Sequence, residues 1–600
     1  MSDPRFRITC ADARFKTELI PVPSPEEGVS LYRVRVTCAE KTAPPPVRIA
    51  WEEPMVGVVS VWMPLSRFDR AVEREANFSR FHYGAPVLAT LGEGDRNRAT
   101  VSLADADTPT ELGFRLKDLA RSDTVEYTVT LFAQTASAIR SYETLLRIDR
   151  RPLPFYETVR SVYERLWKPA GYVIPQPPAA AEDPLYSTWY DFWQNPRADL
   201  LLPDLKIAAE LGMRTVILDD GWQFDGETGD YYSLCGEWQP SREKFPDFGA
   251  FVRGVHELGM KLLVWFSVPF IGKNTSLFET FRGKYLEIDD PMKVGVLDIR
   301  RPELRAFLIG HYRRFLEDYD IDGFKLDFIG SFGGTPDSVP YDPAVMDCET
   351  VPEAVLKLLR EIDETLGAVK PGLLYEYRQG YIGPAINVFG NMLRVGDCPY
   401  DPVRNRVGIT DLRLMGYPSA IHSDMLIWRP EESVQLCARQ LLNILFGVPQ
   451  LSIRLARAPE AHRALIAAFL SYWTRNRDVL LRGSFRPQDP ASNYPVIRAV
   501  GAEKEIVVLH GTRSVELGEL PCDVFLDSDR DGLLVENPTD HVREVALFRC
   551  FDTDPCGTAE IPPRSVVRLD LPRMGMAQVA GDAAAAITRP GRAAGGTART

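Results

Sequence analysis

The stretch DLKIAAELGMRTVILDDGW at 204–222 joins an amphipathic helical pattern to a short apolar strand that ends in two aspartates. Short apolar strands that alternate with amphipathic helices are typical of parallel sheets joined by crossover helices. Seven more strand candidates lie between 185 and 455: LYSTWYDFW (185–193), KLLVWFSV (261–268), DGFKLDFI (322–329), GLLYEYR (372–378), NMLRVGD (391–397), SAIHSDML (419–426) and PQLSIRL (449–455). Eight such units predict a closed (β/α)8 TIM barrel. An open doubly wound sheet is disfavoured because no GxGxxG motif follows the first strand.

The segments on either side of this region alternate with a period of two, as antiparallel strands do. Examples are SLYRVRVTC (30–38) before the barrel and SNYPVIRAV (492–500) after it. We therefore predict a multidomain chain: an antiparallel β-sandwich at 1–155, the catalytic barrel at 156–475 and a small antiparallel β domain at 476–572. The Ala/Gly-rich residues 573–600 predict a disordered tail, because they offer few large apolar side chains to bury.

The composition restricts the partners of the protein. A net charge of −13 disfavours nucleic acids and anionic membranes, which reward basic patches. The chain shows no apolar run suited to a secretory signal or a membrane span, and its nine cysteines include no CxxC pair. We expect a cytoplasmic protein that acts on a neutral substrate without nucleic acid or membrane, and the sequence leaves homo-oligomer formation open.

Polar and aromatic residues gather at the carboxyl ends of the predicted strands, where barrel enzymes carry their pockets. Acids, cations and tryptophans around one mouth favour a sugar pocket, since aromatic faces stack on sugars and charged groups hold hydroxyls. The set comprises Asp219, Asp220, Trp222, Lys325, Asp327, Glu376, Arg378, Arg394, Asp397, Trp189, Trp265 and His422. We interpret His422 as a structural group and not as a catalyst.

Glycoside hydrolysis needs two carboxyl groups on opposite sides of the scissile bond, and Asp327 and Asp397 suit this role. Residues two apart on a strand face the same side, so Lys325 should lie beside Asp327 and hold it ionised as a nucleophile. Asp397 has to stay protonated as the acid, which predicts a drier or more anionic surrounding. Asp401, one helical turn later, competes with Asp397 for this role.

Several of these residues have a structural alternative. Asp327 could form a structural ion pair with Lys325, and the aspartates at 219–220 could cap a turn. The tryptophans at 189 and 265 could be core residues instead of stacking platforms. Glu376 and Arg378 share one strand face, so they either pair with each other or bind substrate.

Five segments resemble, in order and spacing, glycoside hydrolase family 36, the melibiase-type α-galactosidases, and the related family 27. They are RTVILDDGW (214–222), CGEWQPSREKFPDFGAFVRGVHELGMKLLVWF (235–266), VGVLDIRRPELRAFL (294–308), FKLDF (324–328) and GYPSAIHSD (416–424). Residues 86–105 look like the family's N-terminal sandwich. The resemblance implies that Asp327 is the nucleophile, Asp397 the general acid/base, and 219–220 with Trp222 a clamp on the sugar. It also implies that Lys325 and Arg394 contact hydroxyls and order the acids.

The chain departs from that pattern at three places. Leu326 stands where the family has a tryptophan, FSVPFIG (266–272) replaces a Glu-Pro, and EYRQGYIG (376–383) replaces a Cys-Ser-rich segment. These segments shape the pocket around the sugar, so the resemblance supports the reaction better than it supports galactose as the sugar.

The sequence therefore predicts a retaining exo-acting α-glycosidase, an α-galactosidase in the first instance, that works by double displacement on an oligosaccharide or glycoside. The alternatives are another sugar (an α-glucoside, an α-N-acetylgalactosaminide or a β-L-arabinopyranoside), transfer to a sugar acceptor, and a non-catalytic sugar-binding barrel. No cofactor and no metal are expected. DSDRDGLLVENP at 527–538 begins like a calcium loop but has Pro538 at its twelfth position, so we interpret it as a solvated turn.

Overall fold

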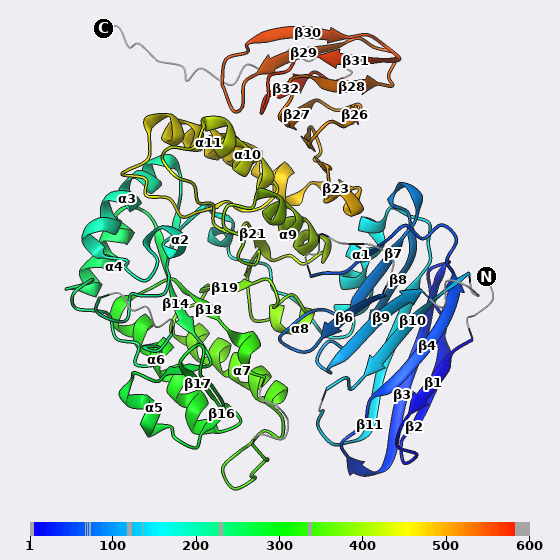
Figure 1. Ribbon diagram of the computed structural model, residues 1–600, viewed down its shortest axis with the longest axis vertical. Helices are drawn as coiled ribbons and strands as arrows, with labels where there is room; N and C mark the ends of the chain where they lie inside the picture. Colours follow the sequence, from blue (N-terminus) through cyan, green and yellow to red (C-terminus); the bar gives the residue numbers. More distant parts are fainter. Residues whose placement is uncertain are drawn as a thin grey trace. The chain divides into compact units, whose positions relative to one another are not determined.

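Figure 1 shows the computed structural model of the protein, which describes residues 5–581 apart from 66–67, 69, 71–73, 117–122, 135, 227–231 and 334–338. The described chain up to Ile427, together with Val448–Ala456, forms one compact unit. Trp428–Gly447 and the described chain from Arg457 onwards form a second compact unit. The first unit contains a sandwich and a barrel, as the sequence predicts.

The N-terminal sandwich consists of two antiparallel sheets with the strand orders β1-β4-β10-β9-β6 and β2-β3-β11-β8-β7-β5. Alternate residues of β3 and β10, such as Val34, Val36 and Val129, are buried in the core between the sheets. The strands are β1 (Arg7–Cys10), β2 (Lys16–Val22), β3 (Val29–Thr42), β4 (Val47–Pro54), β5 (Ser60–Trp62), β6 (Arg74–Ser79), β7 (Val87–Leu91), β8 (Asn97–Leu103), β9 (Thr110–Leu116), β10 (Thr124–Leu131) and β11 (Ile139–Asp149).

All eight predicted barrel strands are present, and each pairs in parallel with its neighbours. In chain order they are β12 (Leu185–Ser187), β13 (Thr215–Leu218), β14 (Lys261–Ser267), β18 (Gly323–Asp327), β19 (Leu374–Arg378), β20 (Met392–Arg394), β21 (Ala420–His422) and β22 (Gln450–Leu451). A parallel bridge between His422 and Val448 closes the ring next to β22. The predicted (β/α)8 fold is confirmed.

Helices connect the strands around the outside of the barrel (Figure 1). They are α2 (Trp189–Phe192), α3 (Ala198–Leu211), α4 (Phe248–Glu257), α5 (Ser276–Thr280), α6 (Pro302–Tyr319), α7 (Val351–Val369), α8 (Pro384–Asn387) and α9 (Pro402–Leu414), with α1 (Phe155–Val162) leading in from the sandwich. Several begin at strong caps. Thr350 and Glu353 form a capping box on α7, and the carboxylate of Asp401 accepts from the Arg404 N–H at the start of α9.

A small antiparallel sheet interrupts the barrel after its third strand, and the sequence analysis missed it. It consists of β15 (Phe270–Gly272), β16 (Tyr285–Asp289) and β17 (Val294–Leu297), with β17 in the middle. The tight turn DDPMK between β16 and β17 is the signal that marks it. This turn matters for the site, because two of its residues reach the cavity described below.

The second unit has a seven-stranded sheet, β23-β24-β25-β27-β32-β29-β30, and a three-stranded sheet, β26-β28-β31. Its strands are β23 (Ser484–Gln488), β24 (Val496–Val500), β25 (Glu505–His510), β26 (Ser514–Glu516), β27 (Cys522–Asp527), β28 (Leu533–Asn537), β29 (Arg543–Phe548), β30 (Gly557–Ile561), β31 (Ser565–Leu569) and β32 (Met576–Val579); its helices are α10 (Val434–Asn443) and α11 (Glu460–Arg482).

This unit differs from the prediction in three respects. The pairs β25–β27 and β26–β28 are parallel, so its sheets are mixed and not purely antiparallel. Helix α11 runs through the predicted boundary at 475. The predicted disordered tail begins too early, because β32 pairs with β27 and β29 and buries Met576, Ala577 and Val579. The remainder of the predicted tail, 582–600, lies outside the described residues.

The turn at 527–538, which begins like a calcium loop, is stabilised by hydrogen bonds from protein side chains to its first aspartate. The carboxylate of Asp527 accepts hydrogen bonds from Arg439 (3.0 Å), Asn443 (2.8 Å) and His510 (2.8 Å), and these donors lower its pKa to about 2 against the effect of burial. An aspartate that is already saturated by three donors is a poor calcium ligand. In the part of the chain that the structure covers, no helix combines the length and the apolarity needed to span a bilayer.

Candidate active site

The carboxyl ends of the barrel strands surround a cavity of about 410 Å³. Eight of the predicted site residues line it, and they include both proposed catalytic acids: Trp189, Asp219, Asp220, Trp265, Lys325, Asp327, Arg378 and Asp397. Tyr232, Pro291, Met292 and Phe328 complete the wall. The two acids therefore open into one cavity and not into separate ones. A sugar bound there can contact both.

Asp327, at the end of β18, is buried and receives three N–H donors. Arg378 donates to its Oδ1 at 2.6 Å, the Phe328 backbone N–H donates to Oδ1 at 2.7 Å, and the Trp265 indole donates to Oδ2 at 3.2 Å. Burial raises the pKa of Asp327, but the cations Arg378 and Lys325 outweigh it and leave the pKa well below its usual value. Asp327 is therefore ionised at neutral pH, as a nucleophile requires.

Lys325 does not pair directly with Asp327 as the sequence predicts. Its ammonium donates to Oδ2 of Asp219 at 2.6 Å, and both side chains are almost completely buried. The charge of Lys325 still lowers the pKa of Asp327, but the direct partner of the nucleophile is Arg378, from the neighbouring strand. The structural alternative, an isolated Asp327–Lys325 pair, is wrong.

Asp219 and Asp220 follow β13 and both line the cavity. The oxygens of Asp220 accept from Gln194 (2.7 Å), Gln223 (2.7 Å) and the backbone N–H that follows it (2.8 Å), and burial raises its pKa to about 6. The next residue has to be glycine, because its φ is +100° and a Cβ atom would lie 2.5 Å from the backbone of Gln194. The LDDG sequence thus holds two carboxylates at the cavity with almost no freedom.

Asp397 lies three residues after β20, and its side chain is 49% exposed. Arg394 donates to its Oδ1 at 2.9 Å. Partial burial raises the pKa of Asp397, but Arg394 and then Lys325 lower it further, so the net shift is downward. The predicted dry or anionic surrounding is wrong: the surrounding is cationic and wet. Asp401, the competing acid, caps α9 and is not a cavity residue.

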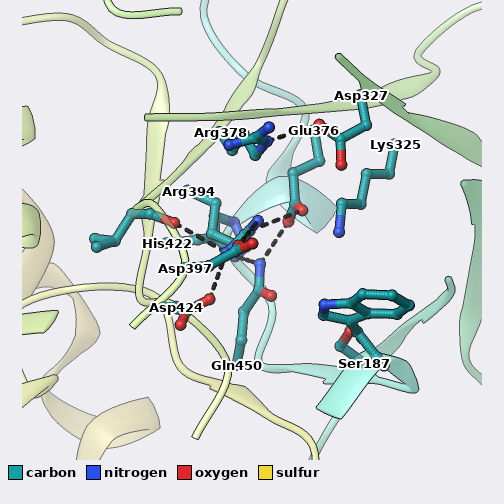
Figure 2. A network of polar contacts seen from close by, with 12 residues as sticks. Ser187, Lys325, Asp327, Glu376, Arg378, Arg394, Asp397, His422, Asp424 and Gln450 are labelled. Atoms are coloured by element: carbon teal, nitrogen blue, oxygen red, sulfur yellow. Dashed lines mark hydrogen bonds and ion pairs between the residues drawn. The ribbon is translucent and has the colours of Figure 1, made fainter. Parts of the chain in front are cut away.

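A buried network holds Arg394 in place (Figure 2). Its guanidinium forms ion pairs with Glu376 (3.4 Å), Asp397 and Asp424, and Gln450 donates to Glu376 at 2.5 Å. Burial raises the pKa of Glu376 and that of Asp424, and nearby Arg394 opposes both shifts. Arg394 and Glu376 were predicted to bind substrate, but neither lines the cavity. Glu376 pairs with Arg394, and Arg394 in turn orients the carboxylate of Asp397.

His422 belongs to the same network and is structural, as predicted. Its Nε2 bonds to the carbonyl of Ala181 at 2.7 Å and its Nδ1 lies 3.2 Å from the amide of Gln450. Burial lowers the pKa of His422 to about 4. The imidazole is therefore neutral at physiological pH and does not face the cavity.

Two of the three predicted tryptophans line the cavity, and the third lies in the hydrophobic core. Trp265 lines the cavity through its contact with Asp327, and Trp189 lines it while stacking on Trp193 with ring centroids 4.4 Å apart. Trp222 was predicted to bind substrate, but it is fully buried: its indole donates to the Trp265 carbonyl at 3.0 Å and it packs against Phe266. The chain turns outward after Gly221, so Trp222 points into the layer between strands and helices.

A turn of the sandwich contacts the two loops that follow the nucleophile strand and the next strand. Arg80 donates to the carbonyl of Gly330 at 3.1 Å, and the Gly84 N–H donates to the carbonyl of Gly380 at 2.8 Å. His82, between them, is completely buried, and burial together with Arg80 lowers its pKa well below the usual value. The sandwich thus fixes the loops that directly follow Asp327 and Arg378.

Five functional positions escaped the sequence analysis. Phe328 directly follows Asp327 and lines the cavity beside it. Asp424 lies at the end of SAIHSD, after the seventh strand, so its strand-end position was a usable signal. Tyr232, Pro291 and Met292 come from loops, where neither periodicity nor a strand end marks a residue as part of a pocket. Within the described residues, no cluster of three or more histidine, cysteine, aspartate or glutamate side chains is arranged to hold a metal ion.

Comparison with known sequences gives a consistent result. Residues 182–383 match the family model named Melibiase. "Alpha-galactosidase 1" of Pediococcus pentosaceus is 28% identical over 147 residues, which are 24% of this chain and 19% of that protein. "Alpha-galactosidase AgaA" of Geobacillus stearothermophilus is 27% identical over 206 residues, 32% of this chain and 26% of that protein. The matched segments thus span a fifth to a quarter of these relatives.

The likeness in fold extends over 97% of the chain. The crystal structure of the GH36 α-galactosidase AgaA from Geobacillus stearothermophilus aligns with 97% of this chain and 88% of its own, with a TM-score of 0.64 at 13% identity. The α-galactosidase from Lactobacillus brevis aligns equally far, with a TM-score of 0.62 at 13% identity. Residues 182–383 are therefore similar to the Melibiase family, in a chain that has the fold of the GH36 α-galactosidases.

Proposed function

We propose that this protein is a retaining exo-α-galactosidase that removes terminal α-linked galactose by double displacement. The observation that carries the proposal is the pair Asp327 and Asp397 in one cavity, the first ionised and buried and the second open to solvent. The Melibiase match and the α-galactosidase relatives support the same reaction.

Asp327 attacks the anomeric carbon of the bound sugar. Its Oδ1 is engaged by Arg378 and the Phe328 N–H, whereas Oδ2 has only the longer contact to Trp265. Oδ2 is therefore the oxygen with a free lone pair, and Oδ1 becomes the carbonyl oxygen of the glycosyl ester, stabilised by its two donors. The bond from the anomeric carbon to the leaving oxygen breaks as the new ester bond forms.

Asp397 donates a proton to the leaving oxygen and then accepts one from the water that cleaves the ester. In the free protein, burial raises the pKa of Asp397, but Arg394 outweighs it and the net shift is downward. A bound sugar displaces water from the exposed carboxyl group and raises the pKa, which favours the protonated form in the complex. The charge of Asp327 acts in the same direction until the ester forms, so the shift reverses when Asp397 has to act as a base.

The proposed sugar is galactose, because the similar proteins are named α-galactosidases and one solved GH36 relative is described in complex with raffinose. One departure from the family does not affect this assignment. Leu326 is buried on the face of β18 opposite to Lys325 and Asp327, so its change from tryptophan does not touch the cavity wall.

A panel of nitrophenyl glycosides tests the proposal, with the α-galactoside, α-glucoside, α-N-acetylgalactosaminide and β-L-arabinopyranoside compared by kcat/KM. We expect the α-galactoside to be the best substrate, and proton NMR of the first product to show the α-anomer. Turnover of another glycoside, without turnover of the α-galactoside, would show that the substrate is that sugar and not galactose. A β-anomer as the first product would exclude double displacement.

Transfer and simple binding are the remaining alternatives. Transfer would appear as di- or oligosaccharide products at high acceptor concentration, at the expense of free galactose. A non-catalytic barrel would bind galactose equally well in the wild type and in Asp327→Asn, and neither protein would turn over any α-glycoside.

A further inference from the structure

The general acid/base of the proposed reaction lies in a segment without regular secondary structure. Residues 395–398 follow β20 and precede α9, and they belong to neither element. The side chain of Asp397 is 49% exposed, and Arg394 donates to its Oδ1 at 2.9 Å. A proton donor has to lie within about 3 Å of the leaving oxygen, so contacts from outside this segment have to fix its position.

One buried side chain, that of Asp424, contacts the chain on both sides of Asp397. Its Oδ1 forms an ion pair with the guanidinium of Arg394, which precedes the acid in the sequence (Figure 2). Its Oδ2 accepts from the backbone N–H of Cys398, the residue directly after the acid, at 2.7 Å. Asp424 is completely buried, and Arg394 and Cys398 are buried as well. A single carboxylate thus holds both ends of the segment that carries Asp397.

Asp424 is fixed in turn by two other elements of the barrel. The Tyr190 hydroxyl of α2 donates to its Oδ2 at 2.8 Å. Asn405 of α9 accepts from the Asp424 backbone N–H at 3.0 Å and donates to the Asp424 carbonyl at 3.0 Å. Burial raises the pKa of Asp424, whereas the guanidinium, the backbone N–H and the hydroxyl favour its ionised form. Asp424 is therefore an acceptor in a fixed position for both Arg394 and the Cys398 N–H.

Resting on the proposed function, we infer that Asp424 is a positioning residue for the general acid/base. It lies outside the cavity wall, so it acts through its neighbours and not on the sugar. It holds Arg394 and the backbone after Asp397, and through them the carboxyl group that protonates the leaving oxygen and later activates water. Without Asp424, the acid remains present but no longer lies at the right distance from the leaving oxygen.

The test compares two substrates that differ in their need for an acid. kcat/KM is measured with an alkyl α-galactoside, whose leaving oxygen has to be protonated, and with a dinitrophenyl α-galactoside, whose leaving group needs no proton. We expect the ratio of the two values, alkyl over dinitrophenyl, to fall about 10- to 100-fold in Asp424→Ala. Misplacing a catalytic group by about 1 Å costs up to about 100-fold in rate. Asp424→Asn should lose less, since its amide oxygen still accepts from the Cys398 N–H.

Asp527→Ala and Asp527→Asn are the matched controls. Asp527 is also buried and accepts hydrogen bonds from three side chains, but it belongs to the second unit. Its variants should keep the wild-type ratio even where they lose stability. Circular dichroism and thermal unfolding show which variants are folded. A wild-type ratio in both folded Asp424 variants, or in Asp424→Asn where it alone folds, would overturn the inference, because a general structural fault slows both substrates alike.

Hydrogen exchange provides a readout that does not depend on turnover. Mass spectrometry of the peptide that contains Cys398 should show exchange about 10-fold faster or more in Asp424→Ala than in the wild type, because the buried N–H loses its acceptor. Asp527→Ala should leave this peptide unchanged. If the wild type hydrolyses no α-glycoside, the proposed function fails, and faster exchange would still support Asp424 as the residue that holds the segment. Unchanged exchange in Asp424→Ala would contradict that role, so the two failures are distinguishable.

Discussion

Lys325 donates a hydrogen bond of 2.6 Å to Asp219, which joins the fourth barrel strand to the second across the floor of the cavity. Replacing Lys325 by methionine leaves the carboxylate of Asp219 buried without its cation. Removing one partner of such a pair costs about 3–5 kcal/mol of the free energy of unfolding. Urea unfolding measures the loss.

Lys357→Met is the matched control, because Lys357 pairs with Asp347 at the surface, with 42% and 34% of the two side chains exposed. An exposed pair contributes about 0–1 kcal/mol. Equal stability losses for the two variants would show that the Lys325–Asp219 pair is not the buried junction described here.

The pH dependence of the reaction follows from the two catalytic acids. Asp327 has to be ionised and its pKa is strongly lowered, so the acid limb of kcat/KM lies at very low pH. Asp397 has to be protonated and its pKa in the free protein is also lowered. Its active form therefore decreases as pH rises above that pKa, about tenfold per unit. We expect kcat/KM for an alkyl galactoside to be highest at acidic pH.

A dinitrophenyl galactoside checks the assignment, since its leaving group needs no proton. Its kcat/KM should stay level over the pH range in which the alkyl galactoside declines. A flat profile for the alkyl galactoside from about pH 5 to about pH 8 would contradict the lowered pKa of Asp397.

The sandwich should influence catalysis through Arg80, whose hydrogen bond to Gly330 fixes the loop after Asp327. Without this bond the loop can shift, and misplacement of a catalytic group by about 1 Å costs up to about 100-fold in rate. We expect Arg80→Met to lower kcat roughly 10-fold or more while KM changes little. Steady-state kinetics with the α-galactoside provide the measurement.

Arg98→Met is a suitable comparison, because Arg98 also belongs to the sandwich and donates to a backbone carbonyl, that of Val56, but it lies on an exposed strand position. Its kcat should equal that of the wild type. The positioning role fails if Arg80→Met behaves in the same way.

Gly221→Ala separates backbone strain from steric conflict. Gly221 and Gly171 both have a positive φ, +100° and +107° respectively. A Cβ atom added at Gly221 would lie 2.5 Å from the backbone of Gln194, whereas one added at Gly171 would meet nothing within 4 Å. Strain costs about 1–3 kcal/mol at each site, and overpacking adds about 1–3 kcal/mol at Gly221 alone. Chemical denaturation of the two alanine variants should therefore give a larger loss for Gly221→Ala, and equal losses would contradict the close approach.

The barrel was predictable because its signal is local. Each strand is a short apolar run between helical patterns, and the polar residue that ends it faces the pocket whatever the rest of the chain does. This logic places Asp219, Asp327 and Asp397 correctly at the cavity. It also explains the failure at Trp222, which follows the left-handed backbone of Gly221 (φ +100°), so its position after a strand no longer tells which way its side chain points.

Partner choice was not predictable, because it depends on residues far apart in the sequence. Lys325 is two residues from Asp327 and on the same strand face, yet it binds Asp219, and Asp327 binds Arg378, 51 residues away. The prediction of a dry or anionic surrounding for Asp397 was wrong for the same reason, since the cations around it, Arg394 and Lys325, come from two different strands. Such contacts follow from the register of the barrel, which no local pattern encodes.

The most direct test of the account is to trap the intermediate with a 5-fluoro α-galactosyl fluoride. Peptide mass spectrometry of the inactivated protein should find the fluorosugar on the peptide that contains Asp327, and Asp327→Asn should remain unlabelled. A sugar attached to any other residue, or turnover of α-galactosides by Asp327→Asn at the wild-type rate, would contradict Asp327 as the nucleophile.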